Sequence, residues 1–266
     1  MGNAADAREE DGDILSAVEP PDSEPIAFKR IAKKTLSDEV FEQLAAEIVH
    51  GKMEPGVSLP AERQLCEMLG VNRGAVREAL KRLAQAGLVV IQQGGGTKVL
   101  DYRRTAGLDL LSRLMFHRDG TIELDVAGSI MEMRAALAPD IARLCAQRAD
   151  DALIAELRAI VSSMHDAEQD LERLQTLSLE FWDLLVRGSG NLAYELAFNT
   201  LRVTYENIRG ALVQVMADEV RDLAAHRAIA NAVAERDEAA ARDAAAALVQ
   251  HGTQRVLGLI EALRRR

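Results

Sequence analysis

The sequence has few of the residues that stabilise small secreted proteins or membrane proteins. Its two cysteines, Cys66 and Cys145, show no pairing pattern, so we expect free thiols in a reducing compartment. No apolar run approaches the roughly 20 residues that cross a bilayer. The N-terminus also lacks a basic segment followed by an apolar one, so no signal peptide is expected. These absences favour a cytoplasmic protein without membrane contact.

The residue patterns of an enzyme are missing as well. The chain has no glycine-rich phosphate loop, no nucleophile elbow and no CxxC motif. One alternative is an enzyme whose helical bundle carries a DNA-binding domain as an appendage. No pair of acid and base residues in the sequence supports it. We therefore expect a non-enzymatic protein that needs no cofactor.

Alanine, leucine and mixed charge dominate the 266 residues, which suits a mainly helical protein with two domains. The first 26 residues hold eight acidic residues, one arginine and three prolines, the composition of a disordered tail. We predict four parts, namely an acidic tail at 1–27, a DNA-binding domain at 28–102, a linker helix at 103–118 and a helical domain at 119–266.

Residues 59–98 predict a helix, a tight turn, a second helix and a hairpin. Gly70 suits a left-handed cap at the end of the first helix, and Asn72 is a good N-cap for the second. Apolar residues then recur at helical spacing until Gly87. A β-branched run, three glycines at 94–96 and a second short strand follow. This order is typical of a winged helix-turn-helix.

Basic residues gather in the same region. Residues 28–104 hold 13 Lys and Arg against nine Asp and Glu, although the whole chain carries a net charge of −10. Arg73 and Arg77 lie four residues apart and share one face of the second helix. A basic module in an acidic protein indicates nucleic acid binding by that module. An ordinary solvated helix face is the alternative, and the ordered helix, turn, helix and wing disfavour it.

The stretch LPAERQLCEMLGVNRGAVREALKRLAQAGLV at 59–89 resembles the DNA-binding domain of GntR-type bacterial transcription regulators. The mild departures from that family's pattern are Cys66 for Ala, Asn72 for Ser, and Ala75 for Thr or Pro. The resemblance implies that arginines contact bases and phosphates, that the helix N-terminus faces the duplex and that the wing reaches the minor groove. The implied DNA-binding residues are Arg63, Asn72, Arg73, Gly74, Ala75, Arg77, Gln93, Gly94 and Gly95.

The rest of the chain predicts helices joined by short loops, which must pack as antiparallel neighbours. Pro139 is expected to open the second of them, and one linker helix at 105–116 precedes them. The predicted fold is therefore mainly α, with an N-terminal winged helix-turn-helix, a small β-hairpin wing and a C-terminal antiparallel bundle of six or seven helices. The predicted helices of the bundle are 121–137, 139–149, 151–167, 170–187, 191–215, 218–235 and 237–263.

Three stretches of the bundle, at 131–149, 181–191 and 225–241, resemble the ligand-binding domain of the FadR subfamily. In its larger branch an Asp and three His hold a divalent metal that binds a small carboxylate. In this sequence Ser178 occupies the position of the Asp, and Trp182 occupies the position of the first His.

Only the second His position of that branch matches, at His226. Leu248 occupies the third His position, and the nearest histidine, His251, follows one helical turn later. Because this set is a poor one for zinc or a similar ion, we expect no bound metal. The other branch binds long-chain acyl-CoA in a metal-free bundle, and it implies an apolar effector here. The candidate ligand-binding residues are Trp182, Tyr194, Phe198, Tyr205, His226, His251 and Thr253.

For the two tyrosines and Phe198, plain core packing is the alternative, and spacing does not decide between the two roles. We expect a homodimeric transcription regulator that binds a pseudo-palindromic operator in double-stranded DNA and responds to a small molecule, first of all acyl-CoA or a fatty acid. A repressor is the expected class, and the sequence does not distinguish it from an activator. Two alternatives stay open. One is the same regulator responding to a small carboxylate or sugar acid through a metal. The other is an architectural DNA-binding protein without an effector.

Overall fold

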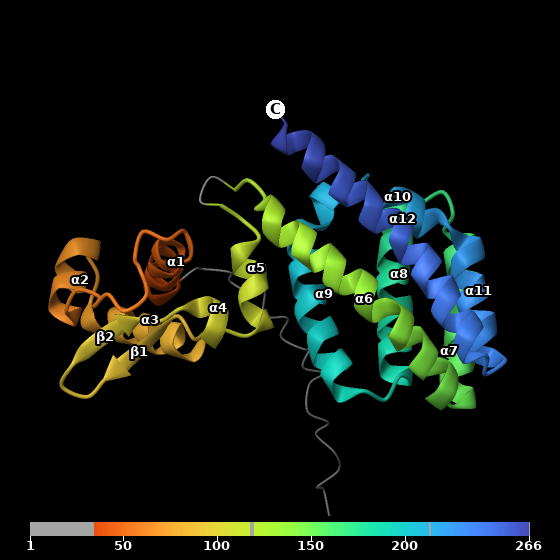
Figure 1. The fold of residues 1–266 in the computed structure, drawn as a ribbon, viewed down its shortest axis with the longest axis horizontal. Coiled ribbons are helices and arrows are strands. Elements are labelled where there is room, and N and C mark those ends of the chain that lie inside the picture. The colour runs from red at the N-terminus through yellow and green to blue at the C-terminus, as the bar shows by residue number, and fades with distance from the viewer. Residues whose placement is uncertain (1–34, 118–119, 213, 266) are drawn as a thin grey trace, which may run out of the picture. The chain divides into compact units, whose positions relative to one another are not determined.

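The computed structural model describes residues 35–117, 120–212 and 214–265. The predicted acidic tail at 1–27 lies outside these ranges. Within them the chain is mainly helical, with one two-stranded sheet, which confirms the predicted fold class (Figure 1). None of the helices in these ranges is long and apolar enough to span a membrane.

The N-terminal part is a winged helix-turn-helix. Val76, Ala79 and Leu83 are completely buried in a core that its helices share with the hairpin. The strands are antiparallel, with Val89 opposite Val99. The elements are α1 (Leu36–Val49), α2 (Glu62–Leu69), α3 (Arg73–Gln85), β1 (Val89–Gln92) and β2 (Gly96–Val99).

Local signals set the turn between α2 and α3. Gly70 ends α2 in the left-handed conformation, with φ 65°, and its N–H bonds to the carbonyl of Cys66. The Asn72 side chain accepts a hydrogen bond of 2.9 Å from the N–H of Ala75 and so starts α3. Both caps agree with the predicted turn.

The prediction of one continuous linker helix was wrong. The connector forms three short helical pieces, α4 (Tyr102–Thr105), η1 (Leu108–Leu110) and α5 (Leu111–Leu114). Ala106 and Gly107 have extended backbones, which interrupt the helical hydrogen bonds after α4. Leu110 is buried in the core of the winged helix, so the connector belongs partly to that core.

The C-terminal part is a bundle whose two longest helices, α6 and α12, pack along one another (Figure 1). Their buried faces carry many small residues, including Ala138, Ala142, Ala241 and Ala245. Small side chains allow two helices to approach closely. The helices described in this part are α6 (Leu124–Arg148), α7 (Asp151–Asp166), α8 (Leu171–Gly188), α9 (Leu192–Leu212), α10 (Ala217–Arg221), α11 (Leu223–Ala234) and α12 (Glu238–Arg264).

Two predicted helix boundaries in the bundle need correction. Pro139 lies inside α6 and does not open a new helix. A proline removes one backbone hydrogen bond, and burial of Ala138 and Ile141 on either side holds the helix together. In contrast, the predicted helix at 218–235 is divided at Asp222, whose side chain caps α11 by accepting a hydrogen bond from the N–H of Ala225.

Gly87 offers a test of the winged-helix packing. It has φ +70°, and a Cβ there would lie 2.5 Å from the carbonyl oxygen of Thr105 in α4. Gly70 has a similar φ of +65° but open space around it. We expect Gly70→Ala to lower the free energy of unfolding by about 1 kcal/mol, and Gly87→Ala by about 2 kcal/mol more because of the backbone clash. Urea denaturation measures both losses, and equal losses would contradict this packing.

Candidate functional site

The exposed face of α2 and α3 carries the predicted DNA-binding arginines. Arg63 pairs with Glu67 at 3.4 Å, and the Nε of Arg77 donates to Glu62 at 2.8 Å. The side chains of both arginines are more than half exposed. Exposed ion pairs of this kind stabilise a protein by about 1 kcal/mol or less, so either guanidinium can exchange its carboxylate for a phosphate or a base.

The beginning of α3 is shaped by its cap. Arg73 and Gly74 are exposed there, beside Asn72. The side chain of Ala75 is buried, at 9% exposed, and its N–H already bonds to Asn72. The structure therefore gives Asn72 and Ala75 a role in placing the helix, and Ala75 offers little surface to a duplex.

The tip of the wing is made of Gln93, Gly94 and Gly95, all of them exposed. Gly94 has φ +72°, and Gly96 follows it with φ +80°. Glycine adopts such values without strain, which allows the tight turn between the strands. The resulting tip is narrow and carries little side-chain bulk.

A cavity of about 160 Å³ lies inside the bundle. The chain has one Trp, three Tyr and five Phe, and four of these nine rings line this one cavity, namely Trp182, Tyr194, Phe198 and Tyr205. Aliphatic side chains complete most of its wall. The other apolar residues around the cavity include Met131, Leu137, Ala138, Ile141, Leu179, Leu201, Met216 and Val256.

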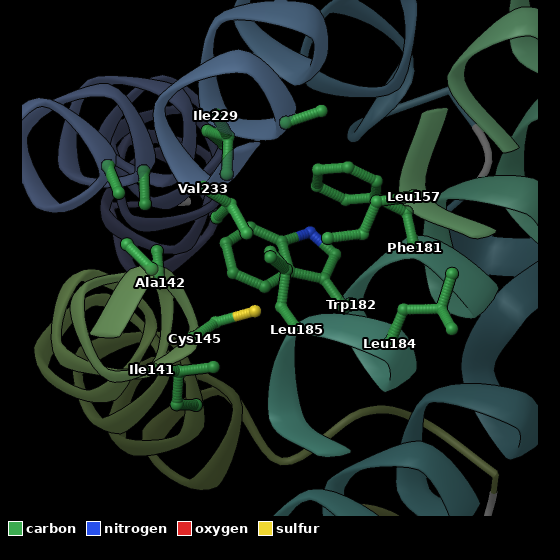
Figure 2. Close-up of a cluster of buried hydrophobic side chains, with 14 of the residues drawn as sticks. Ile141, Ala142, Cys145, Leu157, Phe181, Trp182, Leu184, Leu185, Ile229 and Val233 are labelled. Atoms are coloured by element: carbon green, nitrogen blue, oxygen red, sulfur yellow. The ribbon is translucent and has the colours of Figure 1, made fainter. Parts of the chain in front are cut away.

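Trp182 joins this cavity to the bundle core. It is 8% exposed and lies beside Phe181, Cys145 and Val233 (Figure 2). Burial raises the pKa of the Cys145 thiol to about 12, so this cysteine is inert at neutral pH. The indole is therefore held in place by core packing on one side and borders the cavity on the other.

The cavity has one buried ion pair in its wall. Arg134 of α6 donates two hydrogen bonds to the carboxylate of Glu219 in α10, one of them from Nη1 at 3.1 Å. The Glu219 side chain is only 3% exposed. The Arg134 guanidinium also lies 6.0 Å from the centre of a Trp182 ring. Sequence reasoning missed this pair because its members are 85 residues apart.

His226 lies behind the cavity wall and is completely buried. Its Nδ1 lies 2.8 Å from the carbonyl oxygen of Asp222, which requires a proton on Nδ1. Nε2 then accepts from the Ser178 hydroxyl, at 3.4 Å. Burial lowers the pKa of His226, and the neighbouring Asp222 and Glu219 offset only part of this effect. The imidazole is therefore neutral at physiological pH.

The residues around His226 do not fit a divalent metal. Ser178 supplies a hydroxyl in place of a carboxylate, and Leu248 is a buried aliphatic side chain. Across the described ranges, no three His, Cys, Asp or Glu side chains are placed to hold an ion. One imidazole and one hydroxyl are too few ligands for zinc.

The remaining two predicted ligand residues lie elsewhere on α12. His251 is exposed, and Thr253 is buried. Among the described residues, no hydrogen-bond partner reaches the Thr253 hydroxyl. Neither side chain lines the cavity. Of the seven predicted residues, four are thus brought to one cavity, and His226 contacts its wall through Ser178.

Comparison with known proteins agrees with this two-part arrangement. Residues 36–99 match the bacterial regulatory proteins of the gntR family, and residues 129–251 match the FCD domain. The HTH-type transcriptional regulator Mce2R of Mycobacterium tuberculosis (strain CDC 1551 / Oshkosh) is 40% identical over 225 residues, which cover 85% of this chain and 93% of that protein. The fatty acid metabolism regulator protein of Erwinia tasmaniensis is 29% identical over 167 residues, 63% of this chain and 68% of that one.

Solved structures show the same fold. The structure of Lar, described as controlling the expression of the Listeria monocytogenes agr system, is 19% identical and aligns with a TM-score of 0.54. The alignment covers 85% of this chain and 99% of that one. With a helix-turn-helix relative at 40% identity over most of both chains, the protein belongs to the GntR family of bacterial transcription regulators and combines that family's DNA-binding domain with an FCD effector-binding domain.

Proposed function

We propose that the protein is a homodimeric repressor that leaves its operator when long-chain acyl-CoA or a fatty acid occupies the bundle cavity. The observation that carries the effector assignment is the cavity wall, in which four of the nine aromatic rings of the chain meet aliphatic side chains. Burial of an acyl chain against such a wall gives about 0.8 kcal/mol for each methylene. The resemblance of part of the chain to a fatty acid metabolism regulator supports the same class of ligand.

Operator recognition follows from the exposed face of α3. Arg73 and Arg77 are oriented by a helix that a side-chain cap holds in place. Arginine forms paired hydrogen bonds with guanine in the major groove. Two copies related by a two-fold axis would present two such helices to a pseudo-palindromic operator.

The connector offers a route between the cavity and the DNA-binding helices. Met115 lines the cavity, and Leu110, five residues earlier, is buried in the core of the winged helix. A ligand that displaces Met115 from the cavity wall would act on the connector. Coupling of about 1–3 kcal/mol between two sites is typical and changes operator affinity roughly 5- to 150-fold.

The operator assignment predicts that Arg77→Ala weakens specific DNA binding by about 1–3 kcal/mol, because one base contact is lost. Fluorescence anisotropy with the protein's own promoter DNA measures this loss. Arg158→Ala, on an exposed face of α7, is the matched control and should bind as the wild type does. Unchanged affinity of Arg77→Ala would remove Arg77 from the recognition surface.

The effector assignment predicts that long-chain acyl-CoA releases the protein from promoter DNA at micromolar concentration, whereas free CoA has no effect. The reason is that only the acyl chain buries apolar surface in the cavity. The same anisotropy assay follows the release. If the protein binds promoter DNA tightly and acyl-CoA does not change this affinity, the operator assignment stands and acyl-CoA is excluded as the effector.

The burial of the neutral His226 imidazole has a consequence for stability. Its folded-state pKa lies below its usual value near 6.5, so the unfolded chain binds the proton more readily. Above about pH 6.5 the protonation of His226 should not reduce the free energy of unfolding. That free energy should fall as the pH drops from there toward the lowered pKa.

Urea denaturation measures this pH dependence. The free energy of unfolding of His226→Gln should fall less on acidification than that of the wild type. His251→Gln, at an exposed position on α12, should keep the wild-type dependence. Identical pH profiles for His226→Gln and the wild type would refute this assignment, and strong stabilisation of the wild type by added zinc would contradict the metal-free site.

A further inference from the structure

We infer that two copies of this chain bind each other through the outer stripe of α9, which consists of Leu192, Leu196, Asn199 and Val203. In this contact the two α9 helices run antiparallel across a two-fold axis near Asn199. The inference rests on the proposed function, in which a homodimer binds the operator, and it assigns a surface to that dimer.

The helix α9 carries apolar side chains on two opposite faces. One face supplies three aromatic side chains to the cavity wall, those of Tyr194, Phe198 and Tyr205. At 100° per residue the outer stripe lies on the other side of the helix, within about 60° of arc. Its aliphatic members are 68%, 60% and 50% exposed, namely Leu192, Leu196 and Val203. A helix with apolar residues all round is normally buried on every side, and the described part of the chain leaves the outer stripe open.

The spacing of the outer stripe is that of a helix that packs along another helix. Its members recur at intervals of four, three and four residues, which is the heptad pattern of paired helices. A single asparagine within such an apolar seam fixes the register of the pair, and Asn199 occupies this place. Because an amide both donates and accepts hydrogen bonds, two Asn199 side chains beside a two-fold axis can bond to each other.

The charges next to the outer stripe are complementary to themselves in the same register. Glu195 and Arg202 flank the stripe on one side, four residues before Asn199 and three residues after it. In an antiparallel pair centred near Asn199, Glu195 therefore lies opposite the partner's Arg202. Leu196 lies opposite the partner's Val203 for the same reason. A parallel pair would place like charges together, which is unfavourable, so the charges favour a second copy bound antiparallel, as two-fold symmetry requires.

Arg202 can take a second carboxylate. Its Nη1 lies 4.0 Å from the Oδ1 of Asp183, and both side chains are partly exposed. A pair of that length and exposure contributes little to stability. Arg202 also lines the cavity, so the proposed contact lies directly beside the effector site.

The outer stripe is large enough for the centre of an interface. A stable interface buries about 800 Å² on each partner, and the residues that dominate its free energy gather near its middle. The connector helices η1 and α5 pack against α9. A second copy bound at the stripe therefore contacts the helix that joins the cavity wall to the connector.

Sedimentation equilibrium of the full-length protein measures the dimer dissociation constant. Leu196→Glu places a charge in the middle of the outer stripe of both copies, and we expect it to weaken the dimer by at least about tenfold. Leu259→Glu is the matched control, because Leu259 is an exposed leucine of α12, and it should stay within about threefold of the wild type. Circular dichroism checks that both variants are folded.

A cross-link tests the position of the two-fold axis. Asn199→Cys should form a disulfide-linked dimer on mild oxidation, because a disulfide requires two Cα atoms within about 7 Å. The wild type gives the background of its own two cysteines. Ser162→Cys, at an exposed position on α7, should not exceed that background.

A wild type that stays monomeric at every concentration tested would overturn both this inference and the homodimer of the proposed function. A wild-type dimer that Leu196→Glu leaves unchanged would overturn this inference alone and assign the outer stripe to another occupant. Absence of a cross-linked Asn199→Cys dimer would have the same meaning. The cross-link decides the question even if Leu196→Glu does not fold.

Discussion

The close packing of α6 against α12 is the contact on which the effector domain depends, because both helices supply parts of the cavity wall. Small buried residues such as Ala142 and Ala245 keep the two helices near each other. That approach brings the backbone at Gly252 within reach of Glu219, and Glu219 in turn holds Arg134. The Arg134–Glu219 pair in the cavity wall is thus held by helix packing.

The few aromatic side chains of the bundle lie in its core and in the wall of the cavity. Most of the bundle core is aliphatic, with Phe181 and Trp182 as its large members (Figure 2). Tyr194, Phe198 and Tyr205 lie on α9 and face the same cavity as Trp182. The winged helix has a separate core of its own.

The DNA-binding half could be predicted from sequence because its signals are local. Asn72 caps α3, Gly70 ends α2, and the glycines of the wing mark a turn, all within a few residues of the features they determine. Hydrophobic periodicity also predicted most helices of the bundle, because it reports a buried face. The aromatic cavity residues were named from the resemblance to the FadR subfamily, since spacing alone does not separate a cavity wall from a packed core. The structure adds where those faces meet.

Features that depend on distant contacts could not be predicted. The Arg134–Glu219 pair joins segments 85 residues apart, and no spacing rule connects them. Pro139 reads locally as a helix start, but burial of its neighbours carries α6 through it. The extended backbone at Ala106 likewise breaks a linker whose apolar pattern resembles one helix. In each case tertiary packing decides the outcome.

Coupling between the cavity and the operator surface can be tested by thermodynamic reciprocity. Binding of acyl-CoA to the protein is measured through Trp182 fluorescence, once with free protein and once with protein saturated by its promoter DNA. If the two sites are coupled, DNA must weaken acyl-CoA binding by the same factor by which acyl-CoA weakens DNA binding. We expect equal factors, both clearly greater than one. The same acyl-CoA affinity with and without DNA would contradict this coupling.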